Sequence, residues 1–492
     1  MPNSHMILSA LFTSAIQLLP AAEIHVPTDH KTISAAIENA EHGDLILVAP
    51  GIYQERLVLK AGLTLRSVGA DERGKLGLKR TEVTIIDGSK GADHLPGVTM
   101  AEGAILDGFT ITGVGSFDEK QWQKAWNENG DNQSHDHIGE FGIPGIAITA
   151  VDCRVTRNIV HHIGDTGIAI RGAEGKRVSP LVTENICYRN MGGGIGSMMG
   201  SNAVIEDNQC FENYYAGIGH NNASPVVRGN RCFRNVRAGI GISEGASPLV
   251  RKNLCYHNRR AGIGIRTGKK TRPVIENNDC YENEMAGIGC DEEASPVIRG
   301  NHCHHNKLAG IGARLNSTPY ILENHCHENG AAGIGVNSAE ATIVRNQIKR
   351  NKTAGIGISG ESKANVIENT CRENRLVAVG IPNGGEAYLK GNTLERTDGM
   401  PPIIAVFANS KAILVENTIK GGGIAGIMLS GKLDAVGNTI EGQNGAHGIL
   451  AQKNSEALLS KNRIAGYRAR ITDQKAKSVI EVDSKRMEGP SK

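Results

Sequence analysis

The sequence is poor in aromatic residues and almost balanced in charge. Aromatic side chains make up 4% of its 492 residues, which is unlike an ordinary globular enzyme. The 54 Lys and Arg residues nearly cancel the 51 Asp and Glu residues, leaving a net charge of +3. Such a chain has no overall field that draws it to nucleic acid or to an anionic membrane. We therefore expect no nucleic-acid partner, and any basic surface must be local.

Long apolar runs are missing after the N-terminus. No later stretch is apolar for the ~20 residues that a membrane-spanning helix needs, so we expect no membrane span. The one apolar run, MILSALFTSAIQLLPAAE (Met6 to Glu23), ends in small residues but lacks Lys and Arg ahead of it. Its length predicts a signal peptide over residues 1–22 and a periplasmic or secreted protein. A buried N-terminal segment is the alternative.

The sequence is rich in glycine, with 62 residues, and it contains an internal repeat. Short β-branched runs alternate with Gly, Asn and Ser-Pro turn signals, without an amphipathic helix pattern. A period of about 23 residues indicates a solenoid. We predict an all-β fold, a single right-handed parallel β-helix whose coils stack ~4.8 Å apart. The motif Asn-x-Cys marks the repeat at Cys187, Cys210, Cys232, Cys255, Cys280, Cys303, Cys326 and Cys371.

The cysteine column is predicted to be an interior ladder. A free thiol behaves as a small buried hydrophobe, and a metal ligand would not be exchanged for an aliphatic residue. The Asn two positions earlier is predicted to stack as an amide ladder inside a bend. The column continues as Val160, Ile348, Leu394, Ile419, Ile440 and Ile464.

A second column consists of glycine. In Ala238 to Ile242, AGIGI, strand alternation would place Ala238, Ile240 and Ile242 inward and both glycines outward. Glycine in a strand often marks close approach by a ligand, although it also simply avoids crowding. Arg237 and Arg260 flank this strip. The predicted outward glycines are Gly196, Gly219, Gly241, Gly264, Gly289, Gly312, Gly335 and Gly357.

These motifs carry a family resemblance. Asn-x-(Ile/Cys)-x-x-Asn followed by Ala-Gly-Ile-Gly, over roughly residues 145–465, resembles the parallel β-helix repeat of the pectate-lyase-like superfamily. That repeat also occurs in carbohydrate-binding and sugar-hydrolase modules and in the periplasmic, copper-associated NosD proteins. The segment Ile24 to Lys60 is similar to the start of this fold in pectin methylesterases, which implies a short capping helix, Ile33 to Ala40, before the first strands. One such scaffold hosts many activities, so function must be argued from a site.

The longest interruption of the repeat is GVGSFDEKQWQKAWNENGDNQSHDHIGEFG, residues 113–142. We predict an inserted loop here, between an N-terminal cap with the first coils (23–112) and the repeats (143–470), with a C-terminal cap or tail at 471–492. An insertion on a rigid solenoid is a common place for function, and histidines beside carboxylates suit acid/base chemistry. A polar loop closed by two buried tryptophans is the alternative. Within the insertion the candidate residues are Trp122, Trp126, His135, Asp136 and His137. The coils that follow add His161, His162, Arg171 and Tyr188.

The residue after each repeat cysteine forms an outward column with five consecutive aromatics. Exposed flat rings would suit stacking on sugars, whereas ring-on-ring stacking would only stabilise the sheet. The column reads Tyr188, Phe211, Phe233, Tyr256 and Tyr281, followed by His304 and His327.

Two neighbouring repeats read NHCHHN and NHCHEN. Adjacent extended coils would bring His302, His304, His325 and His327 into one patch. Four imidazoles suit Cu(II) or Zn(II), and no other cofactor is indicated. Because the same columns hold Gln347 and Lys349 one coil later, an ordinary surface patch is the alternative.

The sequence thus predicts an exported protein that binds an acidic polysaccharide or other glycan, and leaves open whether it also acts on it as a lyase, epimerase or hydrolase. In the enzymatic version Arg171 neutralises the uronate carboxylate, His137 or His161 abstracts the C5 proton, and Tyr188 or His135 acts as the acid. The rival prediction is a non-catalytic periplasmic binder of copper or glycan, similar to the NosD proteins.

Overall fold

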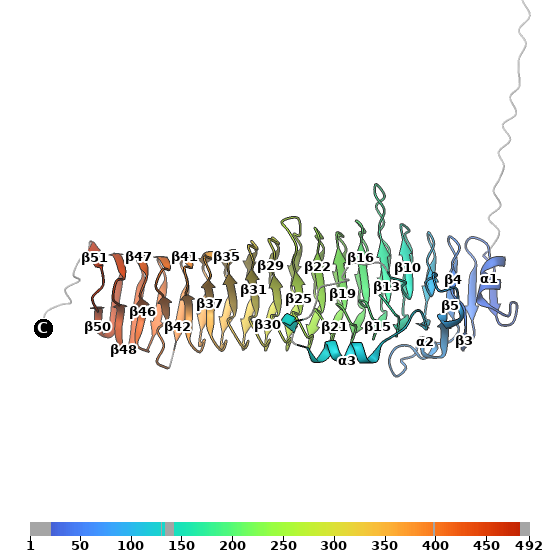
Figure 1. Ribbon diagram of the computed structural model, residues 1–492, viewed down its shortest axis with the longest axis horizontal. Coiled ribbons are helices and arrows are strands. Elements are labelled where there is room, and N and C mark those ends of the chain that lie inside the picture. Colours follow the sequence, from blue (N-terminus) through green and yellow to red (C-terminus); the bar gives the residue numbers. More distant parts are fainter. Residues whose placement is uncertain (1–20, 129, 133–141, 397–398, 483–492) are drawn as a thin grey trace, which may run out of the picture.

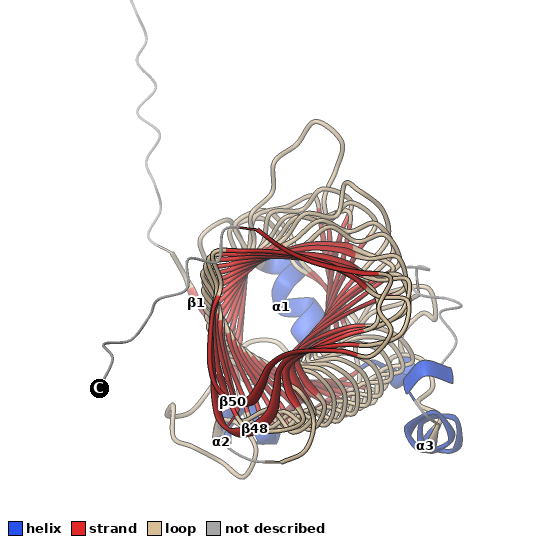
Figure 2. Cartoon of the chain, turned by 90° about the vertical axis from the view of Figure 1, so that its left-hand side faces the viewer, coloured by secondary structure: helices blue, strands red, loops and turns tan. Residues whose placement is uncertain are grey.

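The computed structural model describes residues 21–128, 130–132, 142–396 and 399–482. Its strands stack into one long solenoid (Figure 1), in which each repeated coil contributes a short strand to each of three faces, seen end-on in Figure 2. The strands pair in parallel with the equivalent strands of the coils before and after. The predicted all-β parallel solenoid with coils of about 23 residues is therefore confirmed.

The first face contains nineteen strands among the described residues, from β1 (Glu23–Val26) to β51 (Ser478–Val482). Strands thus continue past residue 470, where the repeats were predicted to end. In the repeated coils this face consists of β11 (Arg154–Thr156), β14 (Leu181–Thr183), β17 (Val204–Glu206), β20 (Val226–Arg228), β23 (Leu249–Arg251), β26 (Val274–Glu276), β29 (Val297–Arg299), β32 (Tyr320–Leu322) and β35 (Glu340–Val344).

The second and third faces meet at the turn that follows the aromatic column. Near the C-terminus, β48 (Thr439–Ala451) and β50 (Arg463–Asp473) run across both. The second face comprises β12 (Ile159–His161), β15 (Ile186–Tyr188), β18 (Gln209–Phe211), β21 (Arg231–Phe233), β24 (Leu254–Tyr256), β27 (Asp279–Tyr281), β30 (His302–His304), β33 (His325–His327) and β36 (Gln347–Lys349). The third comprises β13 (Ile168–Arg171), β16 (Ile195–Met198), β19 (Ile218–Asn221), β22 (Ile240–Ser243), β25 (Ile263–Ile265), β28 (Ile288–Cys290), β31 (Ile311–Arg314), β34 (Ile334–Asn337) and β37 (Ala354–Ser359).

The cysteine ladder lies in the interior, as predicted. Cys210 pairs in register with Cys187 and Cys232, and all three are fully buried free thiols. The aliphatic ends of the column also lie in register, with Val160 before Cys187 and Ile348 after Cys326. The column is therefore part of the apolar core.

Two buried asparagine ladders close the bends of the coils. Asn208 Nδ2 donates to Asn230 Oδ1 of the next coil at 3.0 Å and to the carbonyl of Val182 at 2.9 Å. The second ladder repeats this pattern five residues later, where Asn235 Nδ2 donates to Asn258 Oδ1 at 3.0 Å. These bonds satisfy amide and backbone groups that would otherwise be buried without partners.

The helix α1 (Ile33–Asn39) closes the N-terminal end of the core, as expected. Figure 2, which looks along the solenoid, shows it lying across the bore. Thr32 caps the helix by accepting from the backbone N–H of Ala35 at 3.1 Å, and Ile33 and Ile37 are buried. The resemblance implied that this helix would come before the first strands. In the structure, β1 comes before it.

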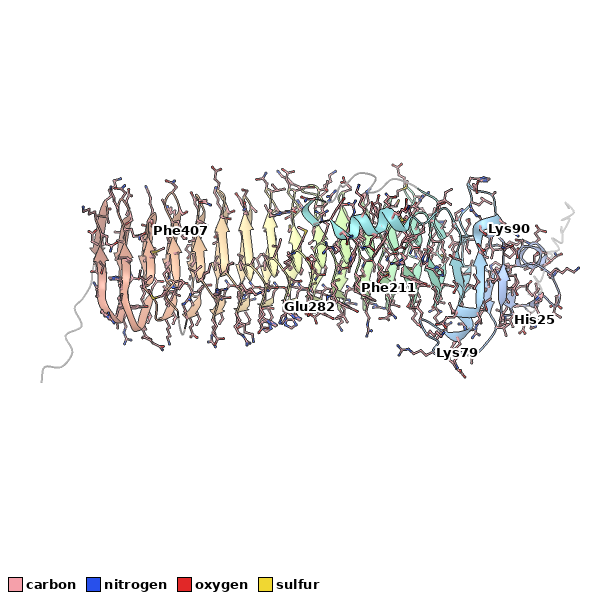
Figure 3. All side chains as sticks on the ribbon, turned by 60° about the horizontal axis from the view of Figure 1, so that its bottom comes forward. His25, Lys79, Lys90, Phe211, Glu282 and Phe407 are labelled. Carbon is pink, nitrogen blue, oxygen red and sulfur yellow. The ribbon has the colours of Figure 1, made fainter. Side chains whose placement is uncertain are left out.

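Two further helices lie on the outside of the solenoid among the described residues. The short α2 (Lys79–Val83) joins strands of the early coils, and α3 (Glu119–Asn127) belongs to the predicted insertion. Figure 3 shows α3 lying lengthwise along the stacked coils. No helix among the described residues is long and apolar enough to cross a membrane.

Candidate functional site

The third face carries a long groove with a volume of about 570 Å³. Its floor is the predicted glycine strip, which runs through eight consecutive coils from Gly196 to Gly357. Seven steps of ~4.8 Å give the strip a length of about 34 Å. The groove is therefore long, shallow and aligned with the axis of the solenoid.

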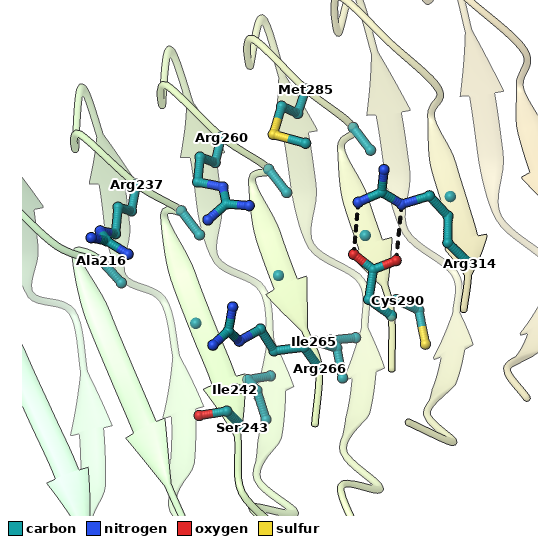
Figure 4. Close-up of a pocket in the computed structure, with 18 of the residues that line it drawn as sticks. Ala216, Arg237, Ile242, Ser243, Arg260, Ile265, Arg266, Met285, Cys290 and Arg314 are labelled. Atoms are coloured by element: carbon teal, nitrogen blue, oxygen red, sulfur yellow. Dashed lines mark hydrogen bonds and ion pairs between the residues drawn. The ribbon is translucent and has the colours of Figure 1, made fainter. Parts of the chain in front are cut away.

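The two margins of the groove carry different side chains. One margin is a row of small alanines from Ala216 to Ala332, and the other combines polar residues with Arg266 and Arg314. Figure 4 shows Arg237 and Arg260 beside the alanine row. The alanine row corrects the sequence reading of Ala238 as a core residue, because β22 begins only at Ile240 and strand alternation does not extend back to Ala238.

Four arginines and two aspartates line the groove. The Arg237 guanidinium lies 4.7 Å from the ring centre of Tyr215, a cation–π contact that holds it against the wall. Arg314 pairs with both carboxylate oxygens of Asp291, through two contacts of 2.9 Å. Asp165 lies at the N-terminal end of the groove, where burial raises the pKa of its carboxyl. The balance of charge along the groove is positive.

Each coil has two glycines near the groove, one in the turn before the strand and one in the strand itself, on the groove floor. The fold requires the turn glycine but not the floor glycine. An added Cβ at Gly239, Gly262 or Gly287 would lie 2.7 Å from a backbone oxygen of the next coil, so these glycines are sterically necessary. An added Cβ at Gly241 or Gly264 would meet only an alanine Cβ, at 3.5–3.6 Å, which is ordinary contact. The floor glycines are therefore not needed for packing.

The inserted helix α3 packs against the solenoid through its tryptophans. Trp122 is 3% exposed and its Nε1 donates to the carbonyl of Glu212 at 2.8 Å. Trp126 stacks on Trp122 with ring centres 5.3 Å apart, and Arg189 lies 4.7 Å from the Trp122 ring. Both tryptophans anchor the insertion. Three other predicted residues of this segment, His135, Asp136 and His137, lie outside the described residues.

Three predicted catalytic residues come together on the second face. His161 Nδ1 lies 2.8 Å from His162 Nδ1, and the His161 ring is 5.0 Å from that of Tyr188. Burial, and to a lesser extent His162, lowers the pKa of His161 to about 4, so its imidazole is neutral at pH 7. Arg171 lies on β13 of the third face, beyond the turn, in the column that continues as Met198 and Asn221 along the groove. The structure thus separates this arginine from the histidine pair by a corner of the solenoid.

The outward aromatic column is a continuous stack of half-buried rings. Tyr188, Phe211, Phe233, Tyr256 and Tyr281 lie 4.8–5.1 Å apart and almost parallel. The stack continues into His304 and His327, at 5.1 and 5.0 Å. The ring-on-ring alternative is therefore what the structure contains, because each inner ring has both faces against its neighbours. Contact of their edges with a glycan remains a prediction.

The four predicted metal-site histidines also lie together, with Asp279, His305 and Glu328 beside them. The sequence reading missed these three. Asp279 occupies the column of His302 one coil earlier, which was a usable signal. His305 and Glu328 lie in the turn after the strand and adopt positive φ angles of 53° and 56°. This turn places their side chains beside the histidine cluster, which strand alternation does not predict.

Comparison with known families agrees with this architecture. A family model described as a right-handed beta helix region matches residues 144–272 and 262–394, together just over half of the chain. The chain belongs to the right-handed β-helix family. The predicted handedness is thereby confirmed, and no curated protein matches the sequence.

Several solved structures resemble this right-handed β-helix at low identity. A mannuronan C-5 epimerase A-module from Azotobacter vinelandii is 13% identical with a TM-score of 0.30, covering 92% of this chain and 94% of that one. The Dettilon tailspike protein is 14% identical with a TM-score of 0.43, covering 70% and 65%. An α-1,3-glucanase from Streptomyces thermodiastaticus is 13% identical with a TM-score of 0.38, covering 80% and 68%. Likeness this distant concerns the fold alone.

Proposed function

We propose that this right-handed β-helix protein binds a linear acidic polysaccharide along the groove of its third face. The floor glycines carry the proposal. Glycine in a strand costs about 0.5–1 kcal/mol relative to alanine, yet it recurs in eight coils where a Cβ would fit. A floor kept free of side chains over about 34 Å suits a polymer lying along the solenoid, the kind of extended ligand that such proteins bind.

The chemistry of the margins supports an anionic sugar chain. The alanine row gives an apolar surface for the C–H faces of sugar rings, and guanidinium groups on both sides suit carboxylates. Of the titratable groups that line the groove, Asp291 is paired with Arg314 and His220 is buried, and Asp165 lies at one end. The His161 pair lies on the second face. The groove therefore favours binding over turnover. Export, proposed from residues 1–22, would bring the protein to such polymers.

The proposal is tested by titrating the purified protein with polyuronate oligomers and with a neutral glucan of equal length, using calorimetry. We expect the polyuronate to bind and the glucan to bind at least tenfold more weakly. Replacing a floor glycine in Gly264→Val should reduce polyuronate affinity at least tenfold by raising the floor. Arg260→Ala combined with Arg266→Ala should weaken binding and reduce its dependence on salt.

The exposed Arg272, which lies outside the groove, provides the matched control. Arg272→Ala should leave affinity and salt dependence unchanged. Equal binding of both polymers, or unchanged affinity in Gly264→Val with an unchanged melting temperature, would exclude the groove as the binding site.

A further inference from the structure

The histidine cluster lies on the second face and is independent of the groove. Its members come from three adjacent coils and surround the end of the aromatic stack. They form three overlapping groups whose ligand atoms lie within 4.8 Å of one another. The cluster comprises Asp279, His302, His304, His305, His325, His327 and Glu328.

Two carboxylates lie beside the outer nitrogens of two histidines in this cluster. His327 Nδ1 donates to Glu328 Oε2 at 2.9 Å, which keeps the proton on that nitrogen and leaves Nε2 as an unprotonated acceptor. Asp279 Oδ1 lies 3.2 Å from His304 Nε2 and 3.5 Å from His302 Nδ1, so it faces the Nδ1 proton that His302 carries when its Nε2 binds a metal ion. This carboxylate–imidazole pairing is typical of metal-ligating histidines.

The inner nitrogens of the same two histidines face each other. His302 Nε2 lies 2.6 Å from His327 Nε2. Because Glu328 holds the His327 proton on Nδ1, His302 Nε2 donates its proton to His327 Nε2 when no ion is bound, and a metal ion bound by both rings would take the place of that proton.

A third imidazole completes a triad. His325 lies on β33, with its ring 5.1 Å from His302 and 4.8 Å from His327. Ligand nitrogens in a tetrahedral zinc site lie about 3.3 Å apart, given Zn–N bonds of about 2.0–2.1 Å. Small side-chain rotations would bring the three nitrogens to that spacing.

We propose that His302, His325 and His327 bind one divalent transition-metal ion, Cu(II) or Zn(II), with Asp279 and Glu328 orienting two of the three ligands. Three imidazole nitrogens suit these borderline cations. The stacked coils fix the spacing of the ligands before the ion arrives. His304 and His305 lie beside the triad, joined through their Nδ1 atoms at 2.8 Å, and complete its polar surroundings.

The test is a titration of the full-length protein, first stripped with a chelator, with Cu(II) alone and with Zn(II) alone. We expect one ion per chain and a melting temperature that rises with metal concentration. Electron paramagnetic resonance of the copper form should show coupling to three nitrogens. His325→Ala should weaken binding at least 100-fold. Asp279→Asn and Glu328→Gln should each weaken it 10- to 100-fold, as expected when a carboxylate no longer orients a ligand.

Two variants separate this site from nonspecific binding or misfolding. His257→Ala removes a histidine from the column of His305, two coils earlier, and should leave affinity unchanged. Lys349→Ala removes a cation that acts on His302 and His325 and should tighten binding, which misfolding could not do. Failure of the wild-type protein to bind either ion, or equal losses in His257→Ala and His325→Ala, would overturn the proposal.

Discussion

His220 is a large polar side chain buried in a column that otherwise holds small or apolar residues. Its register partners are Ser197 and Ile242, it is 3% exposed, and neither ring nitrogen has a hydrogen-bond partner among the described residues. Burial alone lowers its pKa to about 3. A buried polar group without a partner reduces stability by about 1–3 kcal/mol.

We predict that His220→Ile stabilises the protein by about 1–3 kcal/mol at pH 7. The folded-state pKa lies below the unfolded value of about 6.5, so the unfolded wild type binds an extra proton between about pH 6.5 and 3. Wild-type stability should therefore fall through this window by up to about 1.4 kcal/mol per pH unit more than that of the variant. Urea denaturation at pH 7, 5 and 4 measures both effects. Parallel pH profiles for the two proteins would show that His220 does not titrate as described.

At the residue scale, inward positions could be predicted from sequence, whereas contacts between outward residues could not. The burial of Cys232 follows from its exchange with aliphatic residues in one column. The pairing of His327 with Glu328 depends on a positive φ angle in the turn. The side on which Ala238 lies depends on where β22 begins. Turn conformation and strand ends are set by stacking between coils, which a single repeat does not reveal.

At the scale of one strand and the turn before it, replacing the turn glycine and replacing the floor glycine should change stability in opposite directions. Gly262 lies in the turn and Gly264 in β25, two residues apart. We predict that Gly262→Ala destabilises the protein by roughly 1–3 kcal/mol, because its Cβ would overlap the next coil. Gly264→Ala should stabilise it by about 0.4–1 kcal/mol through reduced chain entropy. Chemical denaturation of the pair distinguishes them. Equal destabilisation by both substitutions would mean that the floor glycines are structural after all.

At the scale of the whole molecule, the stacked strands of each coil pair with those of its neighbours, and α3 lies along several coils, so stability is distributed along the stack. We predict that Asn258→Ala, in a central coil, lowers global stability by about 1–3 kcal/mol because it leaves buried groups unpaired. Asn462→Ala, near the C-terminal end, should mainly increase local opening of the last coils. Hydrogen exchange resolved by segment measures this difference. Uniform loss of protection along the chain in both variants would contradict it.

The asparagine ladders have one direction. Along both of them, side-chain Nδ2 groups donate to the Oδ1 of the asparagine in the coil that follows, as from Asn208 to Asn230 and from Asn235 to Asn258. The backbone N–H of Asn208 also donates to Asn230 Oδ1, and the second Nδ2 hydrogen is donated to a backbone carbonyl such as that of Val182. The amide dipoles therefore add along the axis, much as peptide dipoles do in a helix, and consecutive bonds polarise one another. The asparagine ladders therefore give the solenoid an electric polarity along its axis, with their Oδ1 atoms directed toward its N-terminal end, and this contribution should help to align the protein in an external electric field.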